Sequence, residues 1–167
     1  LAALNAAVET HDLQGTIQNT LRLTLFLFEA GEDPSARNRP RVREVVSPDI
    51  RIAKPPMALL LRYLITPWGG TESTRHTLLG RAMQALYDHP IISGSQLVGS
   101  LATEAQALKI TLAPLSLEER TRVWYSVQKP YRLSVSYEVR VVNMDSQVFD
   151  RARPVRERVL DSALPEV

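Results

Sequence analysis

The sequence predicts an α+β protein, with a small, mainly antiparallel or mixed β-sheet and helices packed on it. Two patterns support this prediction. Apolar and polar side chains alternate over residues 131–142, which is typical of a strand with one buried and one solvated face. Residues 74–88 instead place their apolar side chains at the spacing of one helix face. A chain of 167 residues is long enough for one domain with its own core.

The first part of the chain predicts a helix, a strand and a long loop. Leu1–Glu9 has apolar residues at helical spacing, and His11–Asn19 is polar and predicts a loop. Leu21–Phe28 predicts a strand whose second half is apolar on both sides. The segment 29–56 is polar and repeatedly interrupted by proline, so we expect a long loop with room for a short strand at Val42–Val46.

The second part predicts strands that alternate with helices. Met57–Thr66 is apolar on both faces, which indicates a central strand. A helix is expected over Thr74–Asp88, ending before Pro90 because the residue preceding proline is disfavoured in a helix. A short strand at Leu108–Leu112 follows, then a second helix, and finally the alternating strand over Tyr131–Val142.

The second helix and the C-terminal end complete the predicted organisation. Ser116 and Glu119 have the spacing of a capping box, in which each side chain satisfies a backbone amide of the first helical turn. We expect a single domain over residues 1–144 and a charged tail over 145–167 that contacts a partner. In that tail Val155, Val159 and Leu160 have the spacing of a short helix that would dock on a partner.

The composition argues against several classes of protein. The chain has no cysteine, which excludes disulfides and thiolate metal sites and fits assembly in a reducing cytoplasm. Its longest apolar run, Met57–Leu61, is too short to span a bilayer, so we expect no membrane partner. The first residues lack the basic region of a signal peptide. Because the chain begins with Leu1 rather than Met, we expect native residues to precede it.

The sequence contains no recognisable catalytic or cofactor motif. His11, His76 and His89 lie in separate segments without the spacing of zinc ligands. Nucleophile elbows, phosphate-binding glycine loops and dinucleotide fingerprints are not found. We therefore expect no metal, no cofactor and no enzymatic activity. A small enzyme of unrecognised type is the alternative.

One arginine pattern is compatible with two kinds of partner. Four alternate-residue arginines would line one side of an extended segment. No aromatic residue separates them, as a stacking platform for nucleic acid would require, and nearby carboxylates reduce the local positive charge. We therefore expect a solvated loop or a protein contact here, and no nucleic-acid partner. The four residues are Arg37, Arg39, Arg41 and Arg43.

An ordered set of segments carries a family resemblance. The segments are Leu25–Phe28, Asp33–Pro40, Pro55–Leu59, Leu61–Trp68, Leu79–Asp88, Pro90–Ile92, Leu112–Ser116, Val123–Trp124 and Tyr131–Val141. Together they resemble the N-terminal domain family of cap, or tail-terminator, proteins of extracellular contractile injection systems, of the antifeeding-prophage and virulence-cassette type. The resemblance covers about residues 21–142.

The resemblance implies a tail-terminator-like fold and a structural role. Such a protein forms a ring, expected to be a hexamer, on the end of the inner tube and sheath of a phage-tail-like particle. There it stops polymerisation and fixes the particle's length. The implied partners are further copies of itself and the tube and sheath subunits. Assembly would occur in the bacterial cytoplasm, within a particle that can be released. The alternative is a terminator or connector of a phage tail, or another structural component of the same particle.

Candidate contact residues lie mainly in the predicted loop and tail. Arginine suits planar, bidentate contacts at protein interfaces. Trp68, in a predicted turn, is a candidate aromatic anchor, and core packing beneath the turn is its alternative. Core packing is favoured for Trp124 on its helix face. The candidate arginines for ring and sheath contacts are Arg37, Arg39, Arg41, Arg151, Arg153, Arg156 and Arg158.

Overall fold

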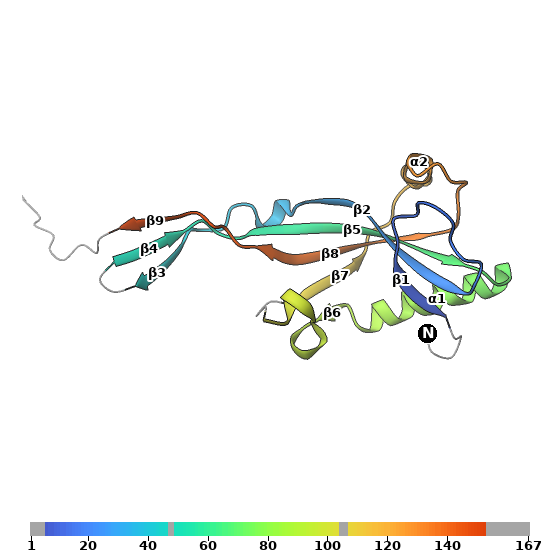
Figure 1. Ribbon diagram of the computed structural model, residues 1–167, viewed down its shortest axis with the longest axis horizontal. Helices are drawn as coiled ribbons and strands as arrows, with labels where there is room; N and C mark the ends of the chain where they lie inside the picture. Colours follow the sequence, from blue (N-terminus) through green and yellow to red (C-terminus); the bar gives the residue numbers. More distant parts are fainter. Residues whose placement is uncertain (1–5, 47–48, 104–106, 153–167) are drawn as a thin grey trace, which may run out of the picture.

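The computed structural model describes residues 6–46, 49–103 and 107–152 and contains two β-sheets. A six-stranded mixed sheet and two helices form the body, and a three-stranded sheet projects from it as the arm (Figure 1). In spatial order the body strands are β1 Ala7–Thr10, β2 Arg22–Glu32, β5 Met57–Trp68, β8 Val135–Met144, β7 Leu108–Leu112 and β6 Ile91–Ile92. The arm strands, also in spatial order, are β3 Val42–Val46, β4 Asp49–Ala53 and β9 Phe149–Ala152.

The predicted α+β architecture is confirmed. β1 lies parallel to β2, and the other strand pairs of both sheets are antiparallel. β5, predicted to be central, lies between β2 and β8. The helices are α1 Glu72–Asp88 and α2 Leu117–Ser126, and short 3-10 turns occur at Pro34–Ala36, Gly94–Gln96 and Gly99–Thr103.

Each helix begins at a hydroxyl side chain that caps its first turn. The Thr71 hydroxyl accepts a hydrogen bond from the backbone N–H of Thr74 at the start of α1. The capping box predicted for α2 is present, because the Ser116 hydroxyl accepts from the Glu119 backbone N–H while the Glu119 carboxylate accepts from the Ser116 backbone N–H. Such caps satisfy amides that have no partner within the helix.

Two predictions for the first part of the chain are wrong. Ala7–Thr10 is a strand rather than the end of a helix, because pairing with the edge of β2 overrides its local spacing. Half of segment 29–56 lies in strands instead of a loop, since β2 continues to Glu32 and the hairpin of β3 and β4 follows. The strand at Val42–Val46 is confirmed. The described prolines of this segment, Pro34, Pro40, Pro55 and Pro56, fall between strands, where a missing backbone donor does little harm.

Two predictions for the C-terminal part also need correction. The alternating strand begins at Val135 instead of Tyr131 and ends at Met144. Phe149–Ala152, predicted to lie in a tail, pairs with β4 and completes the arm. The helix predicted around residues 155–160 lies outside the described residues.

The core lies in two clusters on opposite faces of the body sheet. On one face, α1 places Leu78 and Leu79 against Ile65 of β5 and its neighbours on β2 and β8. On the other face, Trp124 of α2 packs against Leu64, the residue next to Ile65. Successive side chains of a strand point to opposite faces, so one apolar strand serves both clusters. This explains why β5 is apolar on both sides.

Candidate assembly surfaces

Among the described residues, the arm has no core of its own. Every residue of β3 is exposed, every residue of β4 is half-buried and three of the four residues of β9 are exposed. Val45 is 79% exposed and Phe149 is 41% exposed. Neither α1 nor α2 lies over the arm (Figure 1). Three short strands with little buried apolar surface are marginally stable alone, so the arm has the character of a surface that a partner covers.

Polar contacts hold the order of the arm strands. The guanidinium of Arg51 on β4 lies 4.0 Å from the centre of the Phe149 ring on β9, and that of Arg151 lies 5.9 Å from it. Arg41, just before β3, forms a 2.8 Å ion pair with Asp150 of β9. Exposed cation–π contacts and exposed ion pairs each stabilise by up to about 1 kcal/mol. These contacts hold the arm strands next to one another but bury little apolar surface.

The arginines predicted as contact residues do not form a single row. Arg37 pairs with Glu32 of β2 at 3.1 Å, and Arg39 donates to the Asn143 side chain of β8 at 3.3 Å. These two therefore lie at the base of the arm and face different strands. Of the remaining candidates, Arg41 and Arg151 make the arm contacts given above, and Arg153, Arg156 and Arg158 lie outside the described residues.

Trp68 lies in the core, in agreement with the packing alternative. Its side chain is 7% exposed, and its Nε1 donates to the buried hydroxyl of Thr24 at 2.8 Å. Its ring centre is 6.2 Å from that of Trp124, in a tilted arrangement. Trp124 is 1% exposed, which confirms its predicted place in the core. Arg132 stacks above the Trp68 ring at 4.4 Å.

A row of charged side chains crosses the sheet face that carries α2, and we call it the charge row. Glu29, Arg62 and Glu138 occupy paired positions on β2, β5 and β8. Arg62 lies 3.0 Å from each of the two carboxylates. Arg140 continues the row, 2.9 Å from Glu138 and 3.8 Å from Asp33, where the chain leaves β2 for the arm.

The charge row keeps its buried carboxylates ionised. Hydrogen bonds from Ser35 lower the pKa of Asp33, and the nearby charge of Arg140 acts in the same direction. The hydrogen bond from Arg140 lowers the pKa of Glu138, and the one from Arg62 adds to it. Asp33 is 4% and Glu138 is 9% exposed, so these partners offset the cost of removing both charges from water.

Sequence reasoning missed the charge row, although one signal pointed to it. Arg62 is the one charged residue in the otherwise apolar or neutral run Met57–Trp68. A charge within a central strand requires a partner of opposite sign. Its partners Glu29 and Glu138 are far apart in sequence, so only the strand register could identify them.

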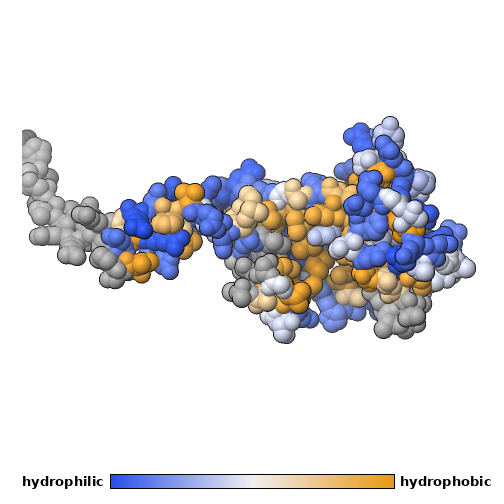
Figure 2. All heavy atoms as spheres, in the orientation of Figure 1, coloured by the Kyte–Doolittle hydropathy of each residue, from blue (hydrophilic) through white to orange (hydrophobic). Residues whose placement is uncertain are grey.

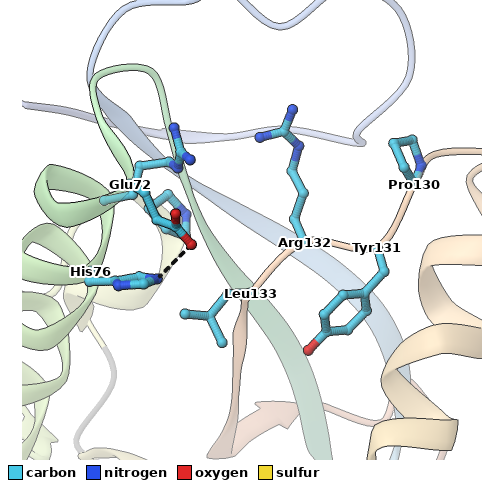
Figure 3. Close-up of a pocket in the computed structure, with 8 residues that line it drawn as sticks. Glu72, His76, Pro130, Tyr131, Arg132 and Leu133 are labelled. Carbon is cyan, nitrogen blue, oxygen red and sulfur yellow. Dashed lines mark ion pairs between the residues drawn. The ribbon is translucent and has the colours of Figure 1, made fainter.

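A small hollow lies between the start of α1 and the segment before β8 (Figure 3). Its volume is about 280 Å³, and its lining includes Arg75, His76 and Arg132. Glu72 and His76 face each other from successive turns of α1 at 4.0 Å. The described lining residues include no hydrogen-bonded pair of nucleophile and base, which covalent catalysis would need.

A larger apolar groove lies between the end of α1 and β7. Its volume is about 620 Å³. Tyr87, 84% exposed, and Leu112, 49% exposed, stand at its margins. Deeper lining side chains are Met83, Leu86, Ile110 and Tyr137. Apolar surface of this kind is common at protein contacts.

Within residues 6–46, 49–103 and 107–152, no three histidine or carboxylate side chains cluster closely enough to hold a metal ion. Among the described helices, none is long and apolar enough to cross a membrane.

One family model matches most of the chain. The family model described as "Pvc16 N-terminal domain" matches residues 3–157. A search of curated proteins returns no match.

Two solved structures share the fold over nearly the whole chain. One is the sheath/tube terminator of PVC, an extracellular contractile injection system, in its extended state, with a TM-score of 0.67 and 20% identity over 98% of this chain. The other is the tube-terminating cap of the anti-feeding prophage, with a TM-score of 0.66 and 20% identity over 94% of this chain. This chain spans 57% and 55% of the respective chains.

Proposed function

Because the chain belongs to the Pvc16 N-terminal domain family, we propose that it is a structural terminator that caps the tube and sheath of a phage-tail-like extracellular contractile injection system. The observation that carries the proposal is the shared fold, over 98% of this chain, with a sheath/tube terminator. The arm supports the same role, because its described strands expose apolar side chains that a protein partner would cover.

Termination has a simple physical basis. A growing tube presents a heterologous interface that every added layer reproduces. A ring that binds this interface but offers no copy of it ends growth and fixes the length. We propose that copies of this chain form such a ring, with sixfold symmetry, on the last layer of tube and sheath.

The proposed contacts use the arm and its base. Arg37, Arg39, Arg41 and Arg151 lie there, and Arg37 and Arg41 are each 63% exposed along the side chain. Arg153, Arg156 and Arg158 follow β9 in sequence and are proposed as further contacts. Strand addition at a sheet edge is the joint that we propose between subunits, because main-chain hydrogen bonds then supply affinity.

The proposed role needs binding and no turnover. It therefore requires no substrate, cofactor, nucleic acid or membrane. The protein would assemble in the bacterial cytoplasm as part of the particle and leave the cell if the particle is released.

Deletion of the gene tests the proposal. Without the terminator we expect tubes or sheaths of uncontrolled length, or unstable particles, because nothing blocks the growing interface. Electron microscopy of purified particles measures the length distribution, and the unaltered gene supplied in trans is the control. Uniform, intact particles of normal length from the deletion strain would contradict the proposal. Capsid genes beside this gene would instead favour a phage-tail terminator.

A further inference from the structure

The body sheet has an open edge on β2. β1 pairs only with Arg22–Leu25, whereas β5 pairs along β2 as far as Glu32. Within the described part of the chain, Phe26–Glu32 thus has a strand neighbour on one side only. An edge of this kind displays backbone N–H and C=O groups that can template another strand.

Few features block this edge. Phe26–Glu32 contains no proline or lysine, the residues that commonly protect edge strands. An irregularity between Leu27 and Glu29 interrupts it, and regular pairing with β5 resumes over Glu29–Glu32. All four of these residues are exposed, and two are the small residues Ala30 and Gly31, which allow another backbone to approach.

The arm presents the complementary edge. β3 pairs with β4 alone among the described strands, and all five of its residues are exposed. Val42 and Val46 are each 52% exposed and Val45 is 79% exposed. Arg43 forms no ion pair with any described carboxylate. An exposed, valine-rich strand is a strong candidate for pairing with another chain.

The charges of the two edges are compatible with pairing. Glu29 and Glu32 are the charged residues of Phe26–Glu32, and they are paired with Arg62 and Arg37 while their side chains stay 53% and 35% exposed. β3 carries one residue of each sign, Arg43 and Glu44, so it brings no net charge that would repel the acceptor edge.

We propose that β3 of one copy adds to the open edge of β2 in the next copy. The inference rests on the proposed ring and names the contact that closes it. The donor and acceptor edges are different surfaces of one chain, and such a heterologous contact forms a ring when its rotation closes. The arm projects beyond the end of β2, so β3 does not lie beside β2 of the same chain (Figure 1).

Cysteine cross-linking tests this contact directly, because the chain has no cysteine of its own. Ala30→Cys marks the acceptor edge and Val45→Cys marks the donor edge, and both side chains are exposed, so folding is preserved. In assembled particles treated with a short bismaleimide, we expect the double variant to give a ladder of covalent oligomers. A mixture of the two single variants should give dimers and no larger species.

Three controls make the result decisive. Either single variant alone should give no cross-linked copies, and dimers of Val45→Cys alone would overturn the proposal because they indicate a symmetric contact. Pairing Val45→Cys with Tyr125→Cys on α2, whose tyrosine is 84% exposed, should give no ladder. Cross-links from Val45→Cys to a sheath or tube subunit alone would also overturn the proposal.

The outcomes separate this inference from the proposed function. If the double variant gives no ladder in particles of normal length that contain the protein, the β3–β2 contact is wrong and the terminator role stands. If the deletion strain makes uniform particles, the terminator role itself fails, whatever the cross-linking shows.

Discussion

The body and the arm differ in how much apolar surface they bury. The body buries apolar side chains on both faces of its sheet, beneath α1 and α2. The arm has the same hydrogen-bonded strand geometry but leaves its valines in water. Strand pairing alone is marginal, whereas burial supplies most of the folding energy. The difference shows that the buried apolar surface of the described residues is concentrated in the body, while the arm keeps its apolar side chains exposed.

Truncation of one apolar side chain in each region should give the largest contrast. Leu78→Ala in the body should lower the free energy of unfolding by about 2–5 kcal/mol, because Leu78 is fully buried and a cavity remains. Val45→Ala in the arm should change it by less than about 0.5 kcal/mol, as is usual for surface positions. Urea unfolding of the isolated chain measures both. A large loss from Val45→Ala would show that the arm adds to the chain's own stability.

The charge row should give an intermediate effect, because it belongs to the body but reaches the base of the arm. Arg62→Met leaves Glu29 without its cation and the buried Glu138 with Arg140 alone, and should cost about 1–3 kcal/mol. Arg122→Met is the matched control, since Arg122 pairs with Glu118 on the exposed face of α2 and should cost about 0.3–0.5 kcal/mol. Equal costs in urea unfolding would mean that the charge row contributes no more than a surface pair.

Acid should weaken the body through the same residues. The pKa values of Asp33 and Glu138 are lowered from 3.8 and 4.5, so the folded state holds their protons less tightly than the unfolded state. Stability should therefore be fully present above about pH 4.5 and decline as the pH falls through the lowered values. A series of urea midpoints from neutral pH into this range measures the decline. The double variant Asp33→Asn, Glu138→Gln should show a shallower decline, and an unchanged slope would contradict the assignment.

The sequence predicted the body better than the arm, for physical reasons. The alternation in β8 and the capping box at Ser116 are local patterns, and they survive into the structure. β1 was mistaken for a helix because its four residues gain their conformation from pairing with β2. β4 and β9 were missed because each is short and their pairing joins residues about a hundred positions apart. Only tertiary contacts define such strands.

The contact role of the candidate arginines stays a prediction. They were expected in a long loop and a tail, and their spacing did not predict that Arg37, Arg39 and Arg41 would face three different neighbours. Trp68 was equally compatible with an anchor and with the core, and only its hydrogen bond to Thr24 and its burial distinguish the two.

The connections between the arm and the body have a mechanical consequence. The chain crosses between them three times, from β2 to β3, from β4 to β5 and from β8 to β9, and two of these crossings take no more than four residues. Tension on the arm would thus run lengthwise into β5 and β8, which are paired with each other over most of their length. Because both strands are pulled from the same end, the load would pass in shear to their hydrogen bonds with the flanking strands β2 and β7, which would share it instead of opening one after another. The arm could therefore bear tension along its length without its strands separating one by one from the body.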